Sequence, residues 1–522
     1  MPGIDIPRMG LPDRLAARLS MAEQHEILLR RRTLLAAAAG AAAAAVTGGG
    51  PAFARSQTPP GRMVVPFGRH LAWGANPRTQ MRVGWQTPYR VHRPYVRIGD
   101  QPWNLGEKVP AELRALHSEI DDVVAPIDQY YLHAELDGLT PGTTYYYAVG
   151  HAGYDPTDIA DFGRIDSFTT APSRRRVAEP FTFTAFGDQG VSVHALRNDG
   201  MVAAQRPAFH LHAGDLCYAD QTGRASTSDV YDPGTWDEFL LQTEPIAASV
   251  PWMPCFGNHD MEAMYSHDGY GGQKARWSFP DNGPEKGIYS FIYGNVGVVA
   301  LDANDVCFER DHNRGYTGGA QTRWLDQRLT FLRAQSDVDF VVVFFHHCAF
   351  STTTAHASEG GVRSLWVPLF DKYQVDLVIN GHNHVYERTD AIRGGVPTTT
   401  PIGGTVHPDR HGTVYVTAGA GGRDLYRFAA PDSYAGHERE TEEIRSYVWA
   451  AGRERVAEKV SWSRVRYTGY SFVAVDSQPA ADGRTSTLTV RAVTERGQEI
   501  DRVVIARPST AAGRLHLGDD VA

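Results

Sequence analysis

Metal-capable side chains follow five apolar runs in the middle of this 522-residue chain. Each run ends in a residue type that binds cations, namely a carboxylate, a phenol, an amide or an imidazole. A glycine precedes the polar residue in four of the five segments, which lets the backbone turn sharply beside a bulky centre. Any one segment is weak evidence, but the ordered set predicts a metal site. In chain order the segments are Gly187-Asp188, Gly214-Asp215-Leu216-Cys217-Tyr218, Gly257-Asn258-His259-Asp260, His346-His347 and Gly381-His382-Asn383-His384.

Asp215 and Tyr218 make the pattern more specific. A phenol keeps its proton to a pH of about 10, so Tyr218 binds a metal only where a hard, highly charged cation removes that proton. Taken alone, the pair is better explained as a turn aspartate beside a half-buried tyrosine. The other segments reverse that preference, because two Asp, one Tyr, one Asn and several His at five strand ends are improbable by chance in a chain with 21 His.

The apolar runs that carry these residues alternate with helical patterns. Leu325, Leu329 and Leu332 mark one amphipathic helix, and a second is expected from Leu365 to Tyr373, with Pro368 near its start. Strand–helix alternation predicts an α/β core whose ligand sites lie at the carboxyl ends of strands. After about residue 410 the chain is β-rich again, with irregular surface loops expected over residues 424–465.

Residues 62–172 show a β pattern without helical segments. The string from Leu139 through Pro141 and Thr143 to Tyr145 resembles the tyrosine corner of fibronectin type III-like sandwiches. We expect Tyr145 or Tyr147 to bond back to that loop. This region holds no cluster of candidate ligands or nucleophiles, so we interpret it as structural.

The N-terminal residues resemble a twin-arginine export signal. Arg31-Arg32 precedes an Ala-rich run over residues 36–46, and Ala52-Phe53-Ala54 is a small-x-small cleavage pattern. The apolar run is too short and too weakly hydrophobic to span a bilayer. We therefore expect residues 1–54 to be a signal peptide and the mature protein to be periplasmic, attached to the cell envelope or extracellular.

Composition excludes several classes of function. The formal net charge of −9 argues against a dedicated nucleic-acid polymer or an anionic membrane as partner. Four cysteines are too few for a disulfide scaffold, and the pattern leaves open whether Cys307 is paired. No segment of the chain is expected to cross a membrane, and the oligomeric state stays open.

The five segments, in this order, resemble those of metallophosphoesterases, and Tyr218 makes them similar to purple acid phosphatases. The resemblance covers roughly residues 62–508. It implies an all-β, fibronectin type III-like sandwich over residues 62–172, followed by an α+β metallophosphoesterase domain over residues 178–508 with two β-sheets flanked by helices. This differs from the single doubly wound sheet that the alternation suggests, and we expect the arrangement of the family.

The resemblance also implies a set of metal ligands. Carboxylates and a phenolate suit hard Fe³⁺, whereas imidazoles and an amide oxygen suit Zn²⁺, Fe²⁺ or Mn²⁺. Asp215 is expected to bridge the two ions, and His347 to be exposed or to support the site. The ligands implied are Asp188, Asp215, Tyr218 and His384 for Fe³⁺, and Asn258, His346 and His382 for the divalent ion.

The implied reaction is hydrolysis of a small phosphate ester by a metal-bound hydroxide nucleophile. His259 is expected to protonate the leaving group or stabilise the transition state; the alternative is that it orients Asp260. His356 lies where the family often carries a substrate-pocket His pair, but Ala355 replaces the other member and Glu359 matches an acidic position just beyond. His356 is thus expected to contact phosphate, with an exposed loop histidine as the alternative.

Three functions follow, in decreasing order of preference. The first is an exported phosphomonoesterase of the acid phosphatase type. The second is a phosphodiesterase for nucleotide or phospholipid head-group esters, because the same metal ligands serve both reactions. The third is a non-catalytic binding protein with a vestigial site, which is disfavoured because no implied ligand is missing from the sequence.

Overall fold

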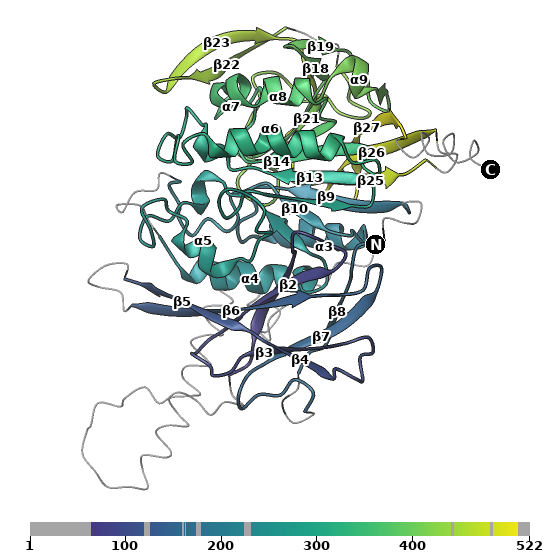
Figure 1. Cartoon of the computed structure of the whole chain (residues 1–522). Coiled ribbons are helices and arrows are strands. Elements are labelled where there is room, and N and C mark those ends of the chain that lie inside the picture. The colour runs from purple at the N-terminus through teal and green to yellow at the C-terminus, as the bar shows by residue number, and fades with distance from the viewer. Residues whose placement is uncertain are drawn as a thin grey trace, which may run out of the picture.

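The structure is a computed structural model that describes residues 64–119, 126–158, 161, 163–173, 179–223, 231–439, 443–480 and 484–509. The expected export signal, residues 1–54, lies outside these ranges. A smaller β domain forms one end of the molecule and a larger domain with two wide sheets forms the rest (Figure 1). Within the described residues, no helix is both long and apolar enough to span a bilayer.

The N-terminal domain is a sandwich of two four-stranded antiparallel sheets. Trp85 is fully buried in its core. The hydroxyl of Tyr145 accepts a hydrogen bond from the backbone N–H of Thr140 at 3.0 Å, as a tyrosine corner requires. Tyr147 instead donates to the carbonyl of Ala248 in the larger domain, 2.7 Å away. The strand orders are β1(Phe67–Trp73)-β2(Gln80–Thr87)-β6(Ile127–Asp137)-β5(Glu112–Ser118) and β4(Glu107–Pro110)-β3(Tyr95–Gly99)-β7(Thr144–Gly150)-β8(Asp166–Thr169).

The larger domain has two seven-stranded mixed sheets, as the family resemblance implies, and not one doubly wound sheet. One sheet has the order β11(Trp252–Pro254)-β10(His210–His212)-β9(Phe181–Phe186)-β25(Ser471–Gln478)-β26(Thr485–Thr494)-β27(Glu499–Pro508)-β20(Thr405–Val406). The other has the order β12(Tyr289–Tyr293)-β13(Val296–Ala300)-β14(Phe340–Phe345)-β16(Leu377–Asn380)-β21(Val414–Ala418)-β17(Tyr386–Thr389)-β24(Ser463–Tyr467). Smaller units are β15(Ser358–Glu359)-β22(Ile444–Ala450)-β23(Glu454–Val460) and β18(Ala391–Arg393)-β19(Val396–Thr398).

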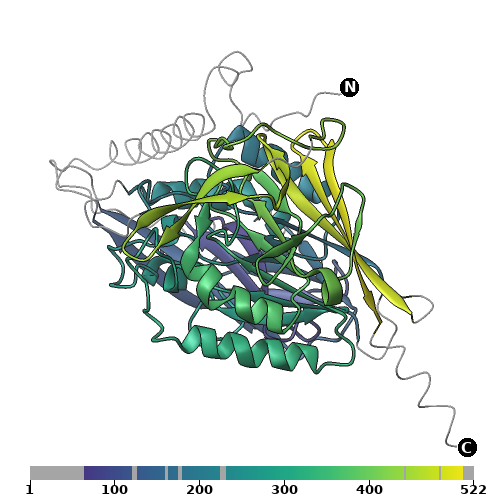
Figure 2. The ribbon, with the colours of Figure 1, turned by 90° about the horizontal axis from the view of Figure 1, so that it is seen from above.

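Helices cover the outer faces of the two sheets (Figures 1 and 2). Helix α6 buries Leu325, Leu329 and Leu332, as its apolar periodicity predicts. Helix α4 packs against β1, so the hydrophobic core of the sandwich continues into the larger domain. The helices are α3(Val193–Ala204), α4(Gly234–Ala247), α5(Gly271–Arg276), α6(Ala320–Arg333), α7(Gly360–Leu365), α8(Val367–Lys372) and α9(Pro408–His411), with one-turn helices η3(Asn258–Asp260) and η4(Ala303–Asp305).

One local expectation from the sequence is confirmed and another is wrong. The helix expected from Leu365 to Tyr373 is α8, which holds Pro368 in its first turn, where a proline costs no helical hydrogen bond. Residues 424–465 are not only loops, since they contain the hairpin of β22 and β23 and the start of β24. All four cysteines, Cys307 included, are buried and unpaired by disulfides.

Candidate metal centre

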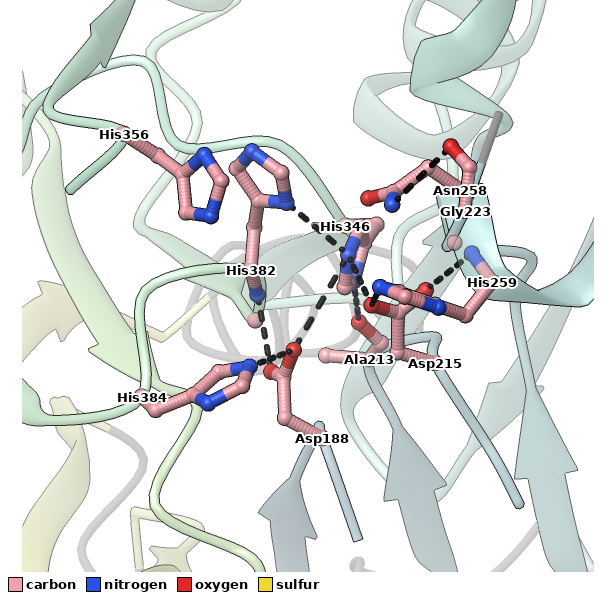
Figure 3. A network of polar contacts seen from close by, with 12 residues as sticks. Asp188, Ala213, Asp215, Gly223, Asn258, His259, His346, His356, His382 and His384 are labelled. Carbon is pink, nitrogen blue, oxygen red and sulfur yellow. Dashed lines mark hydrogen bonds and ion pairs between the residues drawn. The ribbon is translucent and has the colours of Figure 1, made fainter. Parts of the chain in front are cut away.

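The five sequence segments meet where the two wide sheets face each other. Strands β9, β10 and β11 run parallel in one sheet, and β14 and β16 run parallel in the other. Because the carboxyl ends of parallel strands share one edge, the residues that follow them come together. Figure 3 shows the labelled side chains pointing into a common space.

Asp188, Tyr218 and His384 form one half of this cluster. The Tyr218 hydroxyl donates to Asp188 Oδ1 at 3.1 Å and lies 2.9 Å from His384 Nε2. His384 Nε2 is 3.3 Å from the same carboxylate oxygen. A carboxylate, a phenol and an imidazole therefore converge on one point.

Asp215, His346 and His382 form the other half, with one ligand atom of each within 4.8 Å of the others. His346 Nε2 lies 3.2 Å from Asp215 Oδ2 and 3.2 Å from His382 Nδ1. The same His346 nitrogen is 3.9 Å from Asp188 Oδ1, so the two halves adjoin. Asn258 lies beside them, and its buried Oδ1 has no hydrogen-bond partner among the described residues.

The backbone at these ligands is strained. Asp188, Asp215, Tyr218 and His382 have φ angles of 58°, 53°, 61° and 67°, in the left-handed region that side-chain-bearing residues avoid. Such a conformation costs on the order of 1–3 kcal/mol per residue and clusters at functional sites. Four strained positions at one place indicate that the fold holds these side chains in a set direction.

Glycines allow the loops to approach one another. Gly214 has a φ of 81°, and a Cβ there would lie 2.7 Å from the nitrogen of Gly257 and 2.8 Å from His346 Nδ1. A Cβ at Gly257 would lie 2.1 Å from Asp215 Oδ1. The glycines of the sequence pattern thus permit the close packing that was inferred from them.

Hydrogen bonds set the direction of each imidazole. Nδ1 of His346 donates to the carbonyl of Ala213 at 2.8 Å, and Nδ1 of His384 to that of Asp424 at 2.7 Å. In a neutral ring the opposite nitrogen, Nε2, then carries the lone pair. That lone pair faces the cluster in both residues, which is the arrangement found in metal-binding histidines.

Charge interactions inside the cluster are strong. Burial disfavours the charged forms, yet His346 and His259 hold the pKa of the Asp215 carboxyl well below its usual range. Burial likewise opposes protonation of His346, but Asp215 and Asp188 raise its pKa to about 9. Burial, followed by the charges of Asp188 and Asp215, raises the pKa of Tyr218 well above its usual value. The protein alone therefore keeps Tyr218 protonated.

These residues fit a pair of metal ions. The buried orphan oxygen of Asn258 and the inward lone pairs of the imidazoles lack cationic partners among the described residues. Two buried carboxylates, Asp188 and Asp215, lie 3.9 and 3.2 Å from His346 Nε2, where the two halves adjoin. Two cations would satisfy these donors, and a highly charged one would remove the phenol proton.

Three further histidines surround the centre. The ring of His259 donates from Nδ1 to the carbonyl of Asp220 at 2.7 Å, and its backbone N–H donates to Asp215 Oδ1 at 2.8 Å. The centroid of the same ring lies 4.4 Å from that of Tyr218. His347 is fully buried against His382, with a ring-centroid separation of 4.3 Å, so of its two expected placements exposure is wrong and support of the site remains. His356 is half-buried, with its ring 4.1 Å from that of His382.

Two carboxylates in this region were not singled out as functional from the sequence. Asp260 accepts backbone N–H groups of Gly257, Asp215 and Leu216 at 2.7, 2.8 and 3.0 Å and so fastens two ligand loops together. Burial and the charge of Asp215 raise the pKa of Asp260 to about 7. Glu309 lies in the loop between η4 and α6, not at the end of a strand, and reaches both His356 and His382. No sequence pattern marks it.

Comparisons with known proteins agree with this arrangement. The family model described as "Purple acid Phosphatase, N-terminal domain" matches residues 66–170, and that for "Calcineurin-like phosphoesterase" matches residues 183–386. An uncharacterized protein of Mycobacterium tuberculosis is 34% identical over 461 residues, covering 81% of this chain and 82% of that protein. Purple acid phosphatase 21 of Arabidopsis thaliana is 28% identical, covering 68% of this chain and 72% of that protein.

Solved structures share the fold. A purple acid phosphatase, PPD1, from yellow lupin seeds superposes with a TM-score of 0.65 at 20% identity, covering 86% of this chain and 76% of that one. PhoD superposes with a TM-score of 0.51 at 12% identity, covering 88% of this chain and 92% of that one. Both likenesses concern the fold alone.

Proposed function

The chain belongs to the purple acid phosphatases, a family of metal-dependent phosphoester hydrolases, and on that premise we propose that it is an exported phosphomonoesterase with an Fe³⁺–divalent metal pair. The observation that carries the proposal is the convergence of seven metal-capable side chains from five strand ends into two adjoining halves. Small phosphate esters are the substrate class.

The donor chemistry divides the ligands between two ions. Asp188 and Tyr218, with their hard oxygen donors, would hold Fe³⁺ together with the imidazole of His384. Asn258, His346 and His382 would hold Zn²⁺, Fe²⁺ or Mn²⁺. Asp215 would serve both ions. Its Oδ2 lies 3.2 Å from His346 Nε2, and the same nitrogen lies 3.9 Å from Asp188 Oδ1, so Asp215 stands where the two halves adjoin.

When bound, such a pair of ions supplies Lewis acidity, which polarises the phosphoryl oxygens and acidifies water. The side chains of the protein supply position and proton transfer. His259 keeps Nδ1–H on the carbonyl of Asp220, so its Nε2 is the atom free to carry a proton to the leaving oxygen. His356 lies beside His382, where its Nε2 is available to a phosphate oxygen.

The proposal is tested on purified, metal-loaded protein by comparing kcat/KM for p-nitrophenyl phosphate with that for its bis ester. We expect the monoester to be preferred, and a large preference for the bis ester would overturn the monoesterase assignment. Asp215→Ala protein, prepared in parallel, controls for contaminating phosphatases. Elemental analysis and a visible spectrum of the same sample test for two ions per chain and for a ferric–phenolate absorption band.

A phosphodiesterase is the second candidate, favoured by one observation. Ala355 carries no imidazole into the pocket, and its carbonyl instead accepts a hydrogen bond from the Tyr447 hydroxyl. A pocket with one histidine fewer offers less positive charge for the dianion of a monoester. The same pair of substrates decides between the two reactions.

Export rests on the sequence of residues 1–54. Replacing Arg31 and Arg32 by Lys should hold the protein in the cytoplasm if the twin-arginine pathway carries it. N-terminal sequencing of mature protein should begin at Arg55. A mature protein that retains residues 1–54 would contradict this assignment.

A further inference from the structure

Glu309 bridges two imidazoles at the edge of the metal centre. It lies in the loop between η4 and α6, and 6% of its surface is exposed. One carboxylate oxygen, Oε1, is 2.7 Å from His356 Nδ1, and the other, Oε2, is 3.1 Å from His382 Nε2. A single buried side chain thus contacts both an expected metal ligand and the expected phosphate-contacting residue.

The contact with His382 differs from those of the other imidazoles. His346 and His384 donate from Nδ1 to backbone carbonyls and face the centre with Nε2. An ionised carboxylate only accepts hydrogen bonds, so His382 must carry its proton on Nε2 to bond Glu309. Its Nδ1 then presents a lone pair, and that atom lies 3.2 Å from His346 Nε2. The reversed ring of His382 therefore needs an acceptor on the outer side of the centre.

Glu309 is itself held in place. The carboxylate of Glu359 accepts backbone N–H groups of Phe308 and Glu309 at 2.8 and 3.1 Å and the thiol of Cys307 at 3.2 Å. Glu359, three residues after His356, thus acts on the loop that carries Glu309. A fixed backbone at residue 309 gives its carboxylate a defined direction.

The partner loop at His356 is held from its other side. The indole N–H of Trp449 in β22 donates to the carbonyl of His356 at 2.7 Å. The hydroxyl of Tyr447 donates to that of Ala355. The backbone of His356 is thus held by the hairpin and its Nδ1 by Glu309. Its other ring nitrogen, Nε2, contacts the Tyr426 hydroxyl at 3.4 Å, and in the protonated ring it would donate to a phosphate oxygen.

We propose that Glu309 is the positioning residue that fixes the proton on His382 Nε2, aims His382 Nδ1 at the divalent ion, and aims His356 Nε2 at the substrate phosphate. Partners of this kind orient metal-binding histidines and increase their basicity, and their loss typically weakens metal affinity or activity about 10- to 100-fold. The proposal rests on the proposed function, because it presupposes a metal pair at the centre.

The test uses Glu309→Gln, which keeps the volume of the side chain but offers one acceptor oxygen in place of two. Zn²⁺ is titrated into full-length protein stripped of its divalent ion, in competition with a chromogenic chelator. We expect Zn²⁺ to bind about 10- to 100-fold more weakly than in the wild type. Iron content should be unchanged, because the Asp188 half does not contact Glu309. Glu309→Asp, which keeps the charge but shortens the reach, should show a smaller loss in the same direction.

Two variants serve as matched controls. Asp311→Asn removes the same charge two residues further on, from an exposed side chain, and should leave Zn²⁺ affinity and activity unchanged. His356→Phe keeps the ring against His382 but removes the second partner of Glu309. It should raise KM for p-nitrophenyl phosphate while Zn²⁺ affinity stays within about 3-fold of the wild type. Thermal unfolding of the metal-free proteins checks that each variant folds.

The outcomes separate this inference from the proposed function. Wild-type protein that holds fewer than two metal ions per chain would overturn the proposed function. Wild-type protein with two ions and Glu309→Gln with unchanged Zn²⁺ affinity would overturn the role of Glu309 alone. Equal weakening in Asp311→Asn, or in His356→Phe, would also overturn it, because the loss would then stem from net charge or from His356.

Discussion

Two buried polar clusters lie along the segment that runs from Asn258 to Arg276, and they differ in how far the protein satisfies them. In one cluster, Arg276, the last residue of this segment, forms an ion pair with Glu262. The distance from Arg276 Nη1 to Glu262 Oε2 is 2.6 Å, and neither side chain has exposed surface. In the other cluster, Asn258, the first residue of the segment, joins the metal centre. Its side-chain oxygen, Oδ1, has no hydrogen-bond partner among the described residues. One cluster is closed and the other is open.

The closed cluster uses every polar atom. The guanidinium of Arg276 also donates to the hydroxyls of Tyr131 and Tyr231 at 3.3 and 3.0 Å, and its carbon lies 4.3 Å from the ring of Trp236. Glu262 accepts a second hydrogen bond from the Trp236 indole at 2.6 Å. Because Tyr131 belongs to β6, this cluster joins the sandwich to the larger domain.

The open cluster combines strained backbone, adjoining carboxylates and inward lone pairs. Its residues adopt left-handed backbone conformations, which are energetically unfavourable, and yet they do not form a full set of mutual hydrogen bonds. The difference indicates that the Arg276 cluster is complete as folded, whereas the Asp215 cluster is completed by ions. Buried polar groups whose hydrogen bonds are all made thus mark a structural site, whereas buried polar groups left without partners mark a binding site.

Asp215→Ala should have the largest effect on activity. It removes the carboxylate expected to serve both ions, and with it several kcal/mol of transition-state stabilisation. We expect kcat/KM for p-nitrophenyl phosphate to fall on the order of 10³-fold or more, and metal content to fall with it. Activity retained within about tenfold of the wild type would contradict the bridging role. Asp311→Asn is the matched control.

Arg276→Met should have the largest effect on stability. It leaves Glu262 buried without its cation, which typically costs about 3–5 kcal/mol. We expect that loss in denaturant unfolding, while kcat per folded, metal-loaded molecule changes less than about twofold. Adding Glu262→Gln should restore part of the stability, because the unpaired charge is then removed. A fall in kcat comparable with that of Asp215→Ala would erase the distinction between the clusters.

The sequence predicted the open cluster better than the closed one. The metal-capable residues stand out because each follows an apolar strand, and four of the five segments carry a glycine that the close approach of the loops requires. Glu262 lies in a loop and Arg276 ends the short helix α5, without periodicity or motif, and only tertiary packing brings Tyr131 to them. Predicting such a partner needs the docking of the two domains.

Other failures have equally local causes. The hairpin of β22 and β23 was missed because β23 is exposed on both faces over most of its length, so its sequence shows no alternation of apolar and polar residues. Glu309 was missed because an acidic residue in a charged loop is usually solvated. Left-handed φ angles at Asp188 and Asp215 leave no trace in composition, since Asp is only one of several residues that tolerate them.

Metal binding at the open cluster should release protons. His346, with a pKa of about 9 in the metal-free protein, is protonated at pH 7 and must lose that proton to become a ligand. Apparent divalent-metal affinity should therefore rise up to about tenfold per pH unit until pH 9 is approached. Calorimetric titrations in buffers of different ionisation enthalpy measure the protons released. No release at pH 7 would contradict the protonated state.

The same shift affects the stability of the metal-free protein. The pKa of His346 is raised above the usual histidine value of about 6.5, so its ion pair stabilises the fold fully below that pH. That contribution is lost as the pH rises through about 9. Denaturant unfolding of metal-free protein should show this decline. Metal-loaded protein should not show it, because the ligand is then already deprotonated.

Tyr218→Phe should have the smallest effect on rate but the clearest optical one. Phenylalanine keeps the ring beside His259 and removes only the hydroxyl that contacts Asp188 and His384. We expect the visible absorption of an iron-loaded sample to disappear while kcat/KM stays within about tenfold of the wild type. A colourless wild type that holds only Zn or Mn would contradict the ferric assignment and leave the hydrolase intact.

Tyr231→Phe is the matched change in the closed cluster. It removes a phenol that bonds Arg276 and lies 3.0 Å from the Tyr265 hydroxyl. Because the partners left behind are buried, we expect a loss of about 1–3 kcal/mol in stability and no change in the visible spectrum. One lost hydroxyl should thus change colour at the open cluster and stability at the closed one. A spectral change in Tyr231→Phe would place the chromophore elsewhere, whereas equal losses of stability in both variants would show that Tyr218 serves mainly the fold.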